Sequence, residues 1–318
     1  MGVLSLKNPL SLFFSALYAR APAVRRRSRL KRRRKEVAIK DLLFHLEPEG
    51  PEFPGSEFAL SLAQAHGAHL TVASLVIQYP PQLATPASFA GGLEFGDVES
   101  VVKFAEEYRK IAREAFAQLS KSLPAGVSAE HRMIESFPQT IGEDCGRLAR
   151  GFDLSIIPQP SPLGPDYAQD IVTGALFGSA RPVIVLPRGF LGPAKLTKAM
   201  VCWDGGAPAT KALAESLPLL ERAEKVEVVC VQDDGQSPGD PNGAEILRHL
   251  ERHGVAAVLC EIPSAKDEAI ALLDRAAESR ADFLVMGAYG HWRLRELIFG
   301  GTTQRMLAES KLPIFMAH

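Results

Sequence analysis

The sequence predicts two tandem α/β domains, each an open sheet of five mainly parallel strands, packed together as a pseudo-dimer. Short apolar runs rich in β-branched residues alternate with helical patterns, which is typical of βαβ units. The same order of strands and helices occurs twice along the chain. The length of 318 residues also suits two domains, because single hydrophobic cores stop growing at about 250–300 residues.

The first domain is expected over residues 37–190. The expected strands are Lys40–Glu47, His69–Val76, Ser128–Ser136, Asp153–Pro158 and Arg181–Pro187. The expected helices are Ser56–Gly67, Asp97–Leu123 and Ile141–Gly151.

The second domain is expected over residues 191–318, after a hinge near Arg188–Lys195. Its expected strands are Lys198–Trp203, Val226–Val231, Val255–Ile262, Asp282–Gly287 and Pro313–Met316. Its expected helices are Pro208–Glu221, Ala244–Gly254 and Ala265–Arg280, and a further helix starts near Thr302. Periodicity places three apolar residues on one face of the helix 265–280, namely Ile270, Leu273 and Ala277.

Charge is distributed unevenly along the chain. Residues 1–35 hold eleven of the 36 Lys and Arg residues, and all 37 Asp and Glu residues lie beyond them, so the remainder carries a net charge of about −12. An acidic body argues against nucleic acid as the main partner of the folded domains.

The basic segment 1–36 has three readings. Its short apolar stretch resembles a secretory signal, but dense positive charge follows it. An Arg-rich segment without acids also resembles an organelle transit peptide, and its basic run could contact anionic lipid or nucleic acid. The favoured expectation is a disordered extension before a cytoplasmic protein. No stretch of the sequence reaches the roughly 20 apolar residues of a membrane-spanning helix.

The spacing of the four cysteines is not that of metal ligands. Cys145, Cys202, Cys230 and Cys260 form no Cys-x-x-Cys pair and no Cys/His cluster. Three of them lie at or near the ends of strand-like runs, where cysteine usually serves as a small buried apolar residue. Reduced thiols are expected, and neither a metal nor a disulfide is implied.

Glycines near the C-terminus form the main candidate site. Gly287 and Gly290 follow the fourth strand of the second domain, and Gly300 and Gly301 precede two threonines, Thr302 and Thr303. Glycine lets backbone N–H groups approach an anion, and a helix N-terminus adds a favourable dipole. The spacing matches neither the P-loop nor the dinucleotide-binding glycine motif. It still predicts a phosphate cradle in the crevice at the carboxyl ends of the strands.

This set of residues resembles the universal stress protein family. Nucleotide-binding members carry Gly-x-x-Gly, nine residues, then Gly-Ser/Thr. Here Gly287 and Gly290 fill the first part, nine residues follow, and Gly300 fills the second. The resemblance covers both domains and implies a Rossmann-like fold with ATP as ligand, together with Mg. Gly301 stands where ATP-binding members have Ser or Thr.

The resemblance also assigns further residues. The Asp after the first strand, which contacts the adenine and ribose side of ATP, corresponds to Asp204. The end of the second strand, which offers its backbone to adenine, corresponds to Val231. In the first domain, Leu46 is aligned with Asp204, and prolines occupy the loop after the fourth strand. The first domain is therefore expected to be degenerate as a nucleotide site.

The expected function is that of a tandem universal stress protein that binds adenine nucleotide in its second domain and acts in stress response and signalling. The motifs assemble no catalytic set, so any ATP hydrolysis is expected to be slow and incidental. Self-association is expected through the last strands, Val183–Leu186 and Ile314–Ala317. The alternatives are a nucleotide-free scaffold acting through protein contacts, a nucleotide-hydrolysing or adenylyl-transferring relative, and an electron-transfer flavoprotein subunit.

Overall fold

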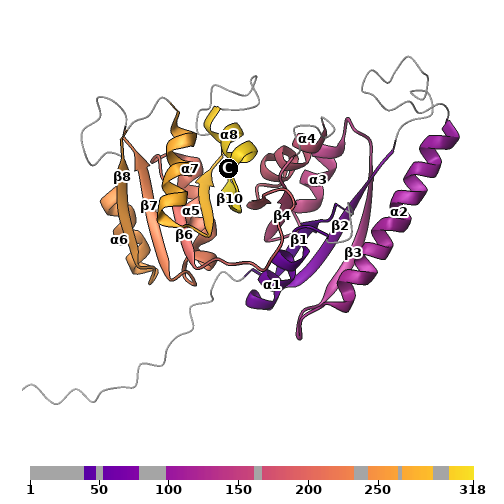
Figure 1. Cartoon of the computed structure of the whole chain (residues 1–318), viewed down its shortest axis with the longest axis horizontal. Helices are drawn as coiled ribbons and strands as arrows, with labels where there is room; N and C mark the ends of the chain where they lie inside the picture. The colour runs from indigo at the N-terminus through magenta and orange to yellow at the C-terminus, as the bar shows by residue number, and fades with distance from the viewer. Residues whose placement is uncertain are drawn as a thin grey trace, which may run out of the picture. The chain divides into compact units, whose positions relative to one another are not determined.

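The computed structural model describes residues 39–47, 53–78, 98–160, 167–232, 243–263, 267–288 and 301–318. The basic segment 1–36 lies outside these ranges. Residues Val37–His318 form one compact unit, drawn as a ribbon in Figure 1. No helix in the described ranges is both long and apolar enough to cross a membrane.

The first half of the compact unit contains five strands and their covering helices (Figure 1). The strands are β1 (Asp41–His45), β2 (His69–Ile77), β3 (Ala129–Ser136), β4 (Leu154–Pro158) and β5 (Val183–Leu186). The helices are α1 (Ser56–His66), α2 (Val98–Lys121), α3 (Ile141–Ala149) and α4 (Tyr167–Thr173), and α4 continues into a π-helical turn, η3 (Gly174–Gly178).

The second half repeats this order of elements. Its strands are β6 (Lys198–Cys202), β7 (Lys225–Val231), β8 (Ala257–Ile262), β9 (Phe283–Gly287) and β10 (Ile314–Ala317). Its helices are α5 (Ala207–Leu220), α6 (Gly243–Arg252), α7 (Glu268–Ser279) and α8 (Gly301–Glu309). Local signals set the ends of α7, since Asp267 caps its N-terminus through Ile270 N and Arg280 ends it with φ 54°.

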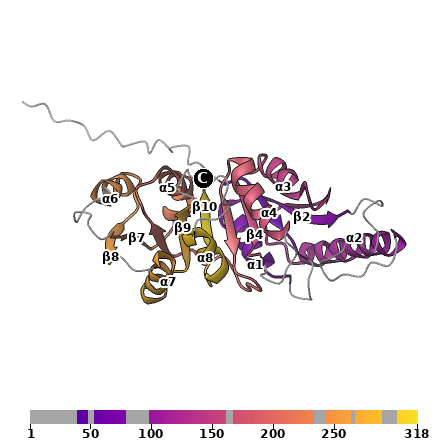
Figure 2. The ribbon, with the colours of Figure 1, turned by 90° about the horizontal axis from the view of Figure 1, so that it is seen from above.

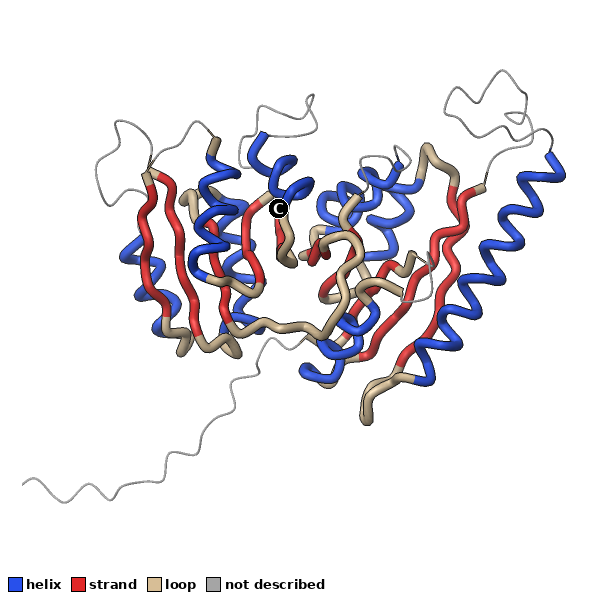
Figure 3. Tube along the Cα trace, viewed as in Figure 1, coloured by secondary structure: helices blue, strands red, loops and turns tan. Residues whose placement is uncertain are grey.

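The ten strands run in the order β3-β2-β1-β4-β5-β10-β9-β6-β7-β8. Strands pair in parallel within each half, as between β1 and β2 or β6 and β9. The last strands of the halves, β5 and β10, pair antiparallel, with Ile314 opposite Val185. Figure 3 shows these strands in red. This arrangement confirms the predicted fold class: each half is an α/β array of five parallel strands, and the last strands join the two halves, as in a pseudo-dimer, into one ten-stranded sheet.

Hydrophobic cores cover both faces of the sheet. One core packs the strands against α1, α2, α5 and α6, with Phe44, Phe58 and Phe283 at its centre. The other packs them against α3, α4, η3, α7 and α8. In the second half, Figure 2 shows α5 and α6 on one side of the strands and α7 and α8 on the other. This two-sided cover is why central strands such as β5, β9 and β10 are buried and almost wholly apolar.

Backbone hydrogen bonds make the two halves equivalent residue by residue. Asp153 N donates to Asp41 O at 2.9 Å, and Asp282 N donates to Lys198 O at 2.8 Å. The side chains of Asp153 and Asp282 then accept from the backbone at the start of β1 and β6, at 2.7 Å from Lys40 N and 3.0 Å from Lys198 N. The same carboxylate therefore fastens the first strand of each half.

Two expectations about helices were wrong. The sequence analysis placed no helix between β4 and β5, where α4 and η3 lie. It also placed Ile270 on the apolar face of α7, but Ile270 is 45% exposed. The buried residues of this helix are Ala269, Leu272 and Ala276, one position earlier. The buried face of α7 is formed largely by small alanines. The prediction gave more weight to the large apolar Ile270 and was therefore displaced by one residue.

Four glycines bring α3 and η3 into backbone contact. A Cβ on Gly174 would lie 1.9 Å from Gly142 O, and one on Gly146 would lie 2.6 Å from Gly174 O. A Cβ on Gly178 would lie 3.2 Å from Gly146 Cα. The spacing of four residues on both segments aligns these glycines on facing sides, so the two helical segments touch without side chains between them.

Candidate functional site

The candidate site lies at the carboxyl ends of β6 and β9. In the sheet, β6 has β7, the next strand along the chain, as its neighbour on one side and β9 as its neighbour on the other. The strand order therefore reverses at β6, and open α/β sheets bind ligands in the crevice at such a point. Cys202 pairs with Met286 in the register, so the residues after both strands emerge side by side.

Asp204 follows β6 at this crevice and is exposed to solvent. Its Oδ1 accepts a hydrogen bond from Gly206 N at 2.8 Å, and Gly205 between them has φ 74°. This turn leads directly into α5 and holds the carboxylate at the strand end. The adjacent Trp203 is only 6% exposed and belongs to the core, so the structure assigns it to packing.

Gly287 ends β9 where the backbone is crowded. A Cβ at this position would lie 2.3 Å from Ala209 N and 2.5 Å from the Pro208 carbonyl carbon. The first turn of α5 therefore packs directly on the end of β9, and only glycine fits. This contact gives Gly287 a structural role that the sequence analysis did not identify, and its contact with phosphate stays a prediction.

The N-terminus of α8 carries the other described residues of the glycine loop. Gly301 is exposed, and a Cβ built on it meets no atom within 4 Å. Thr302 Oγ1 donates to Glu268 Oε2 at 3.1 Å. Thr303 is 6% exposed. Gly290 and Gly300 lie outside the described residues.

Val231, predicted to meet adenine, ends β7 and is half-buried. It pairs with Ile262 of β8 in the parallel register. Trp203 N donates to Val229 O at 2.8 Å, so Val231 lies beyond the end of β6 at the same edge of the sheet. The structure thus brings Asp204, Gly287 and Val231 to one edge.

Two buried thiols lie behind this edge. Burial raises the pKa of Cys202 to about 12, and the charge of Asp204 adds to the shift. Burial also raises the pKa of Cys230 to about 11, with smaller contributions from Glu261, Cys260 and Asp204. Both side chains therefore remain thiols at neutral pH, and neither supplies a thiolate nucleophile.

In the first half, the residue equivalent to Asp204 lies one position later in the chain than the sequence analysis expected. Leu46 N donates to Ala73 O as Trp203 N donates to Val229 O, both at 2.8 Å. Leu46 is therefore equivalent to the buried Trp203, and Glu47 is equivalent to Asp204. The alignment of Leu46 with Asp204 was wrong, because the exposed carboxylate at the end of β1 is one residue later.

His45, the residue before Leu46 and Glu47, is buried in the first half, with 3% of its surface exposed. Neither ring nitrogen has a hydrogen-bond partner. Burial lowers the pKa of His45 from 6.5 to about 4. The imidazole is therefore neutral under ordinary conditions, at an energetic cost to the fold.

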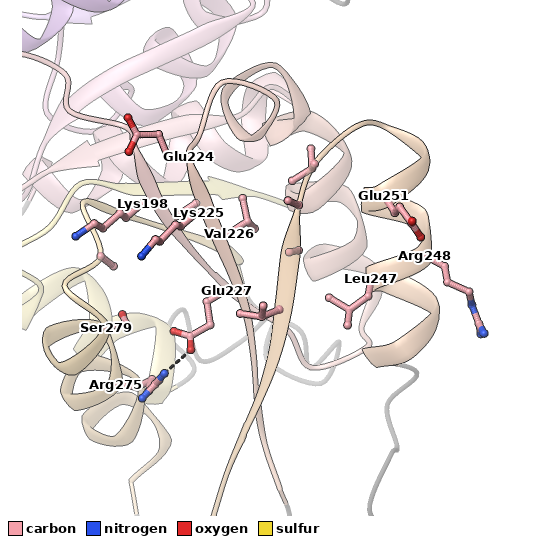
Figure 4. A pocket seen from close by; sticks show the side chains of 16 residues that line it. Lys198, Glu224, Lys225, Val226, Glu227, Leu247, Arg248, Glu251, Arg275 and Ser279 are labelled. Atoms are coloured by element: carbon pink, nitrogen blue, oxygen red, sulfur yellow. Dashed lines mark hydrogen bonds and ion pairs between the residues drawn. The ribbon is translucent and has the colours of Figure 1, made fainter.

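A hollow of about 810 Å³ lies at the opposite end of the second half. It is lined by the starts of β6, β7 and β8 and by parts of α6 and α7. Figure 4 shows Arg275 directed at Glu227 within it, and the two form an ion pair. The hollow does not coincide with the predicted crevice, and the strand-order argument favours the carboxyl ends as the ligand site.

The fold and the crevice define an open-sheet α/β protein of the Rossmann-like class, whose two halves are joined through their last strands. No family model matches the chain. A universal stress protein of Synechocystis, Slr1230, is 31% identical over 142 residues, which are 42% of this chain and 46% of that protein. The chain thus spans about half the length of this curated relative.

Two solved structures share the fold over most of the chain. A universal stress protein from Archaeoglobus fulgidus is 15% identical, with a TM-score of 0.66 over 88% of this chain and 96% of that one. A protein of unknown function from Pseudomonas aeruginosa is 16% identical, with a TM-score of 0.53 over 88% and 92%. The chain is thus similar in sequence to a universal stress protein over part of its length, and it shares its fold with these two solved structures.

Proposed function

We propose that this chain is a cytoplasmic universal-stress-type protein that binds an adenine nucleotide, ATP, in its second half and acts in stress response and signalling. The observation that carries the proposal is the exposed Asp204 at the point where the strand order reverses. Its carboxylate is suited to accept hydrogen bonds from ribose hydroxyls or adenine. Val231 lies one strand away, where its backbone would meet the base.

The phosphates would lie between Gly287 and the N-terminus of α8. Backbone N–H groups of a helix N-terminus favour anions, and the space beside Gly301 is open. These features fit a nucleotide, and Mg would supply positive charge to its phosphates. Binding rather than catalysis is proposed, and the two thiols behind the crevice stay protonated and offer no thiolate nucleophile.

A nucleotide-free scaffold is the second candidate. The start of α8 favours this candidate, because it offers few hydroxyl groups to a phosphate. Gly301 has no hydroxyl, and the Thr302 hydroxyl already donates to Glu268. Thr303, which carries the next hydroxyl along the helix, is buried. In this case the tandem pair would act through protein contacts alone.

The first experiment is to denature the purified full-length protein and identify released small molecules by mass spectrometry, with calorimetric titration of ATP. About one adenine nucleotide per chain is expected. Asp204→Ala should weaken ATP binding about ten- to hundredfold, the loss expected for a hydrogen bond to a charged group. Asp204→Asn is the conservative variant, because its side-chain oxygen can still accept the hydrogen bond from Gly206 N and only the charge is removed.

The matched control is Asp274→Ala, which removes an exposed carboxylate from α7. It should leave ATP affinity unchanged. A protein that releases no nucleotide and ignores millimolar ATP would contradict the nucleotide proposal and support the scaffold.

Gly301→Ser is expected to raise ATP affinity about tenfold, because it adds a hydroxyl donor at the phosphate end. The open space around Gly301 accommodates the new side chain. Titrations of ATP and adenosine should show the gain for ATP alone. Gly151→Ser, where the nearest atom to a Cβ is 3.7 Å away, is the control. An equal gain for adenosine would argue against a phosphate contact.

A further inference from the structure

Gln159 occupies the position in the first half where the glycine loop begins in the second. Its N donates to Leu186 O at 2.7 Å, as Ala288 N donates to Ala317 O at 3.0 Å. Gln159 and Ala288 are therefore equivalent. The Gln159 side chain is buried, with 6% of its surface exposed, although glutamine is seldom buried without a specific partner.

The amide of Gln159 is bonded at both ends. Its Nε2 donates to Leu307 O of α8, in the other half of the chain. Its Oε1 accepts from Arg188 N at 3.4 Å. A side chain with both a donor and an acceptor is needed to satisfy these two backbone groups.

Leu307 O is one of the carbonyls that a helix leaves without an internal partner. It lies in the last turn of α8, which ends at Glu309. Near this end, Ser310 N donates to Met306 O at 3.1 Å. Gln159 thus caps the C-terminus of α8 from the other half, directly after the end of β4.

The opposite end of α8 is Gly301, at the phosphate end of the proposed crevice. Met306 and Leu307 pack the helix into the core, and Arg305 pairs with Asp267 beside α7. A helix of nine residues is short and rigid, so a contact that fixes one end also restricts the other.

We infer that Gln159 is a positioning residue, which holds α8 in place and thereby aligns the phosphate end of the nucleotide crevice in the other half. The inference rests on the proposed function for its effect on nucleotide binding. The capping contact can be tested without nucleotide.

The test uses Gln159→Met in the full-length chain, which keeps the side-chain length and removes both polar groups. Hydrogen exchange by mass spectrometry reports the protection of residues 301–309. The expected result is exchange about fivefold faster in α8, the effect of one lost hydrogen bond. Exchange in β1, in the core of the first half, should not change. Gln118→Met, an exposed position on α2, is the control.

Titrations of ATP and adenosine supply the second readout. Affinity for ATP should fall about fivefold and affinity for adenosine should not. Gln159→Glu gives a second variant, since a carboxylate accepts from Arg188 N but cannot donate to Leu307 O. It should loosen α8 in the same way.

Each outcome decides the inference. Unchanged exchange of α8 in both variants would overturn the cap. Faster exchange of α8 with an unchanged ratio of ATP to adenosine affinity would overturn the alignment of the phosphate end. If the unmodified protein binds no adenine nucleotide, the proposed function and the alignment both fail, while faster exchange of α8 would still establish the cap.

Discussion

Gly174→Ala is expected to destabilise the protein by about 3 kcal/mol, near the upper end for overpacking in a core. The new Cβ would lie 1.9 Å from Gly142 O, a backbone atom that cannot rotate away. The segments α3 and η3 would have to separate, and the buried residues beneath them would lose contacts. Urea unfolding followed by circular dichroism measures the loss.

Gly151→Ala is the matched control, because the nearest atom to its Cβ is Leu148 O at 3.7 Å, an ordinary contact. Its effect should stay within about 0.5 kcal/mol. If Gly174→Ala were as mild as Gly151→Ala, the close contact between α3 and η3 would be wrong.

Acid is expected to destabilise the protein through His45. The pKa of this side chain is about 4 in the folded state because of burial, against 6.5 when unfolded. Between these two values the unfolded chain binds a proton that the folded protein does not. His45 therefore does not reduce the free energy of unfolding above pH 6.5. As the pH decreases below this value, the free energy of unfolding falls, by about 3 kcal/mol in total at pH 4.

His45→Leu should remove this part of the pH dependence. Relative to the unmodified protein, the variant should gain about 2 to 3 kcal/mol of unfolding free energy between pH 7 and pH 4.5. The comparison cancels the other groups, including His66, whose pKa is also lowered to about 4. Denaturant unfolding at a series of pH values measures the difference. Parallel curves for the two proteins would contradict the burial of an uncharged His45.

The strands were the most predictable part of the fold. Runs such as Val183–Leu186 are apolar throughout, and that pattern alone indicates a buried parallel strand. The segment α4–η3 was missed because its glycines and threonine oppose helix formation in isolation. Its stability comes from contact with α3, and the only signal in the sequence is the matched spacing of Gly142 with Gly146 and Gly174 with Gly178.

The candidate site could be predicted only in part. Asp204 was identifiable because it follows a buried strand and matches the position that the family resemblance assigns to an Asp. The equivalence of Glu47 was missed, since the order of residues does not show which carbonyl each backbone N–H reaches. Gln159 was also beyond sequence reasoning, because its partner Leu307 lies 148 residues away in the chain.

The pairing of β5 with β10 within one chain frees the two halves to change separately. In a symmetric homodimer, every substitution appears at both sites at once. Here a substitution alters one half alone, and the covalent link keeps the partner at a high effective concentration even when the interface weakens. One crevice can therefore keep a ligand while its counterpart becomes part of the scaffold, an asymmetry that identical subunits cannot encode.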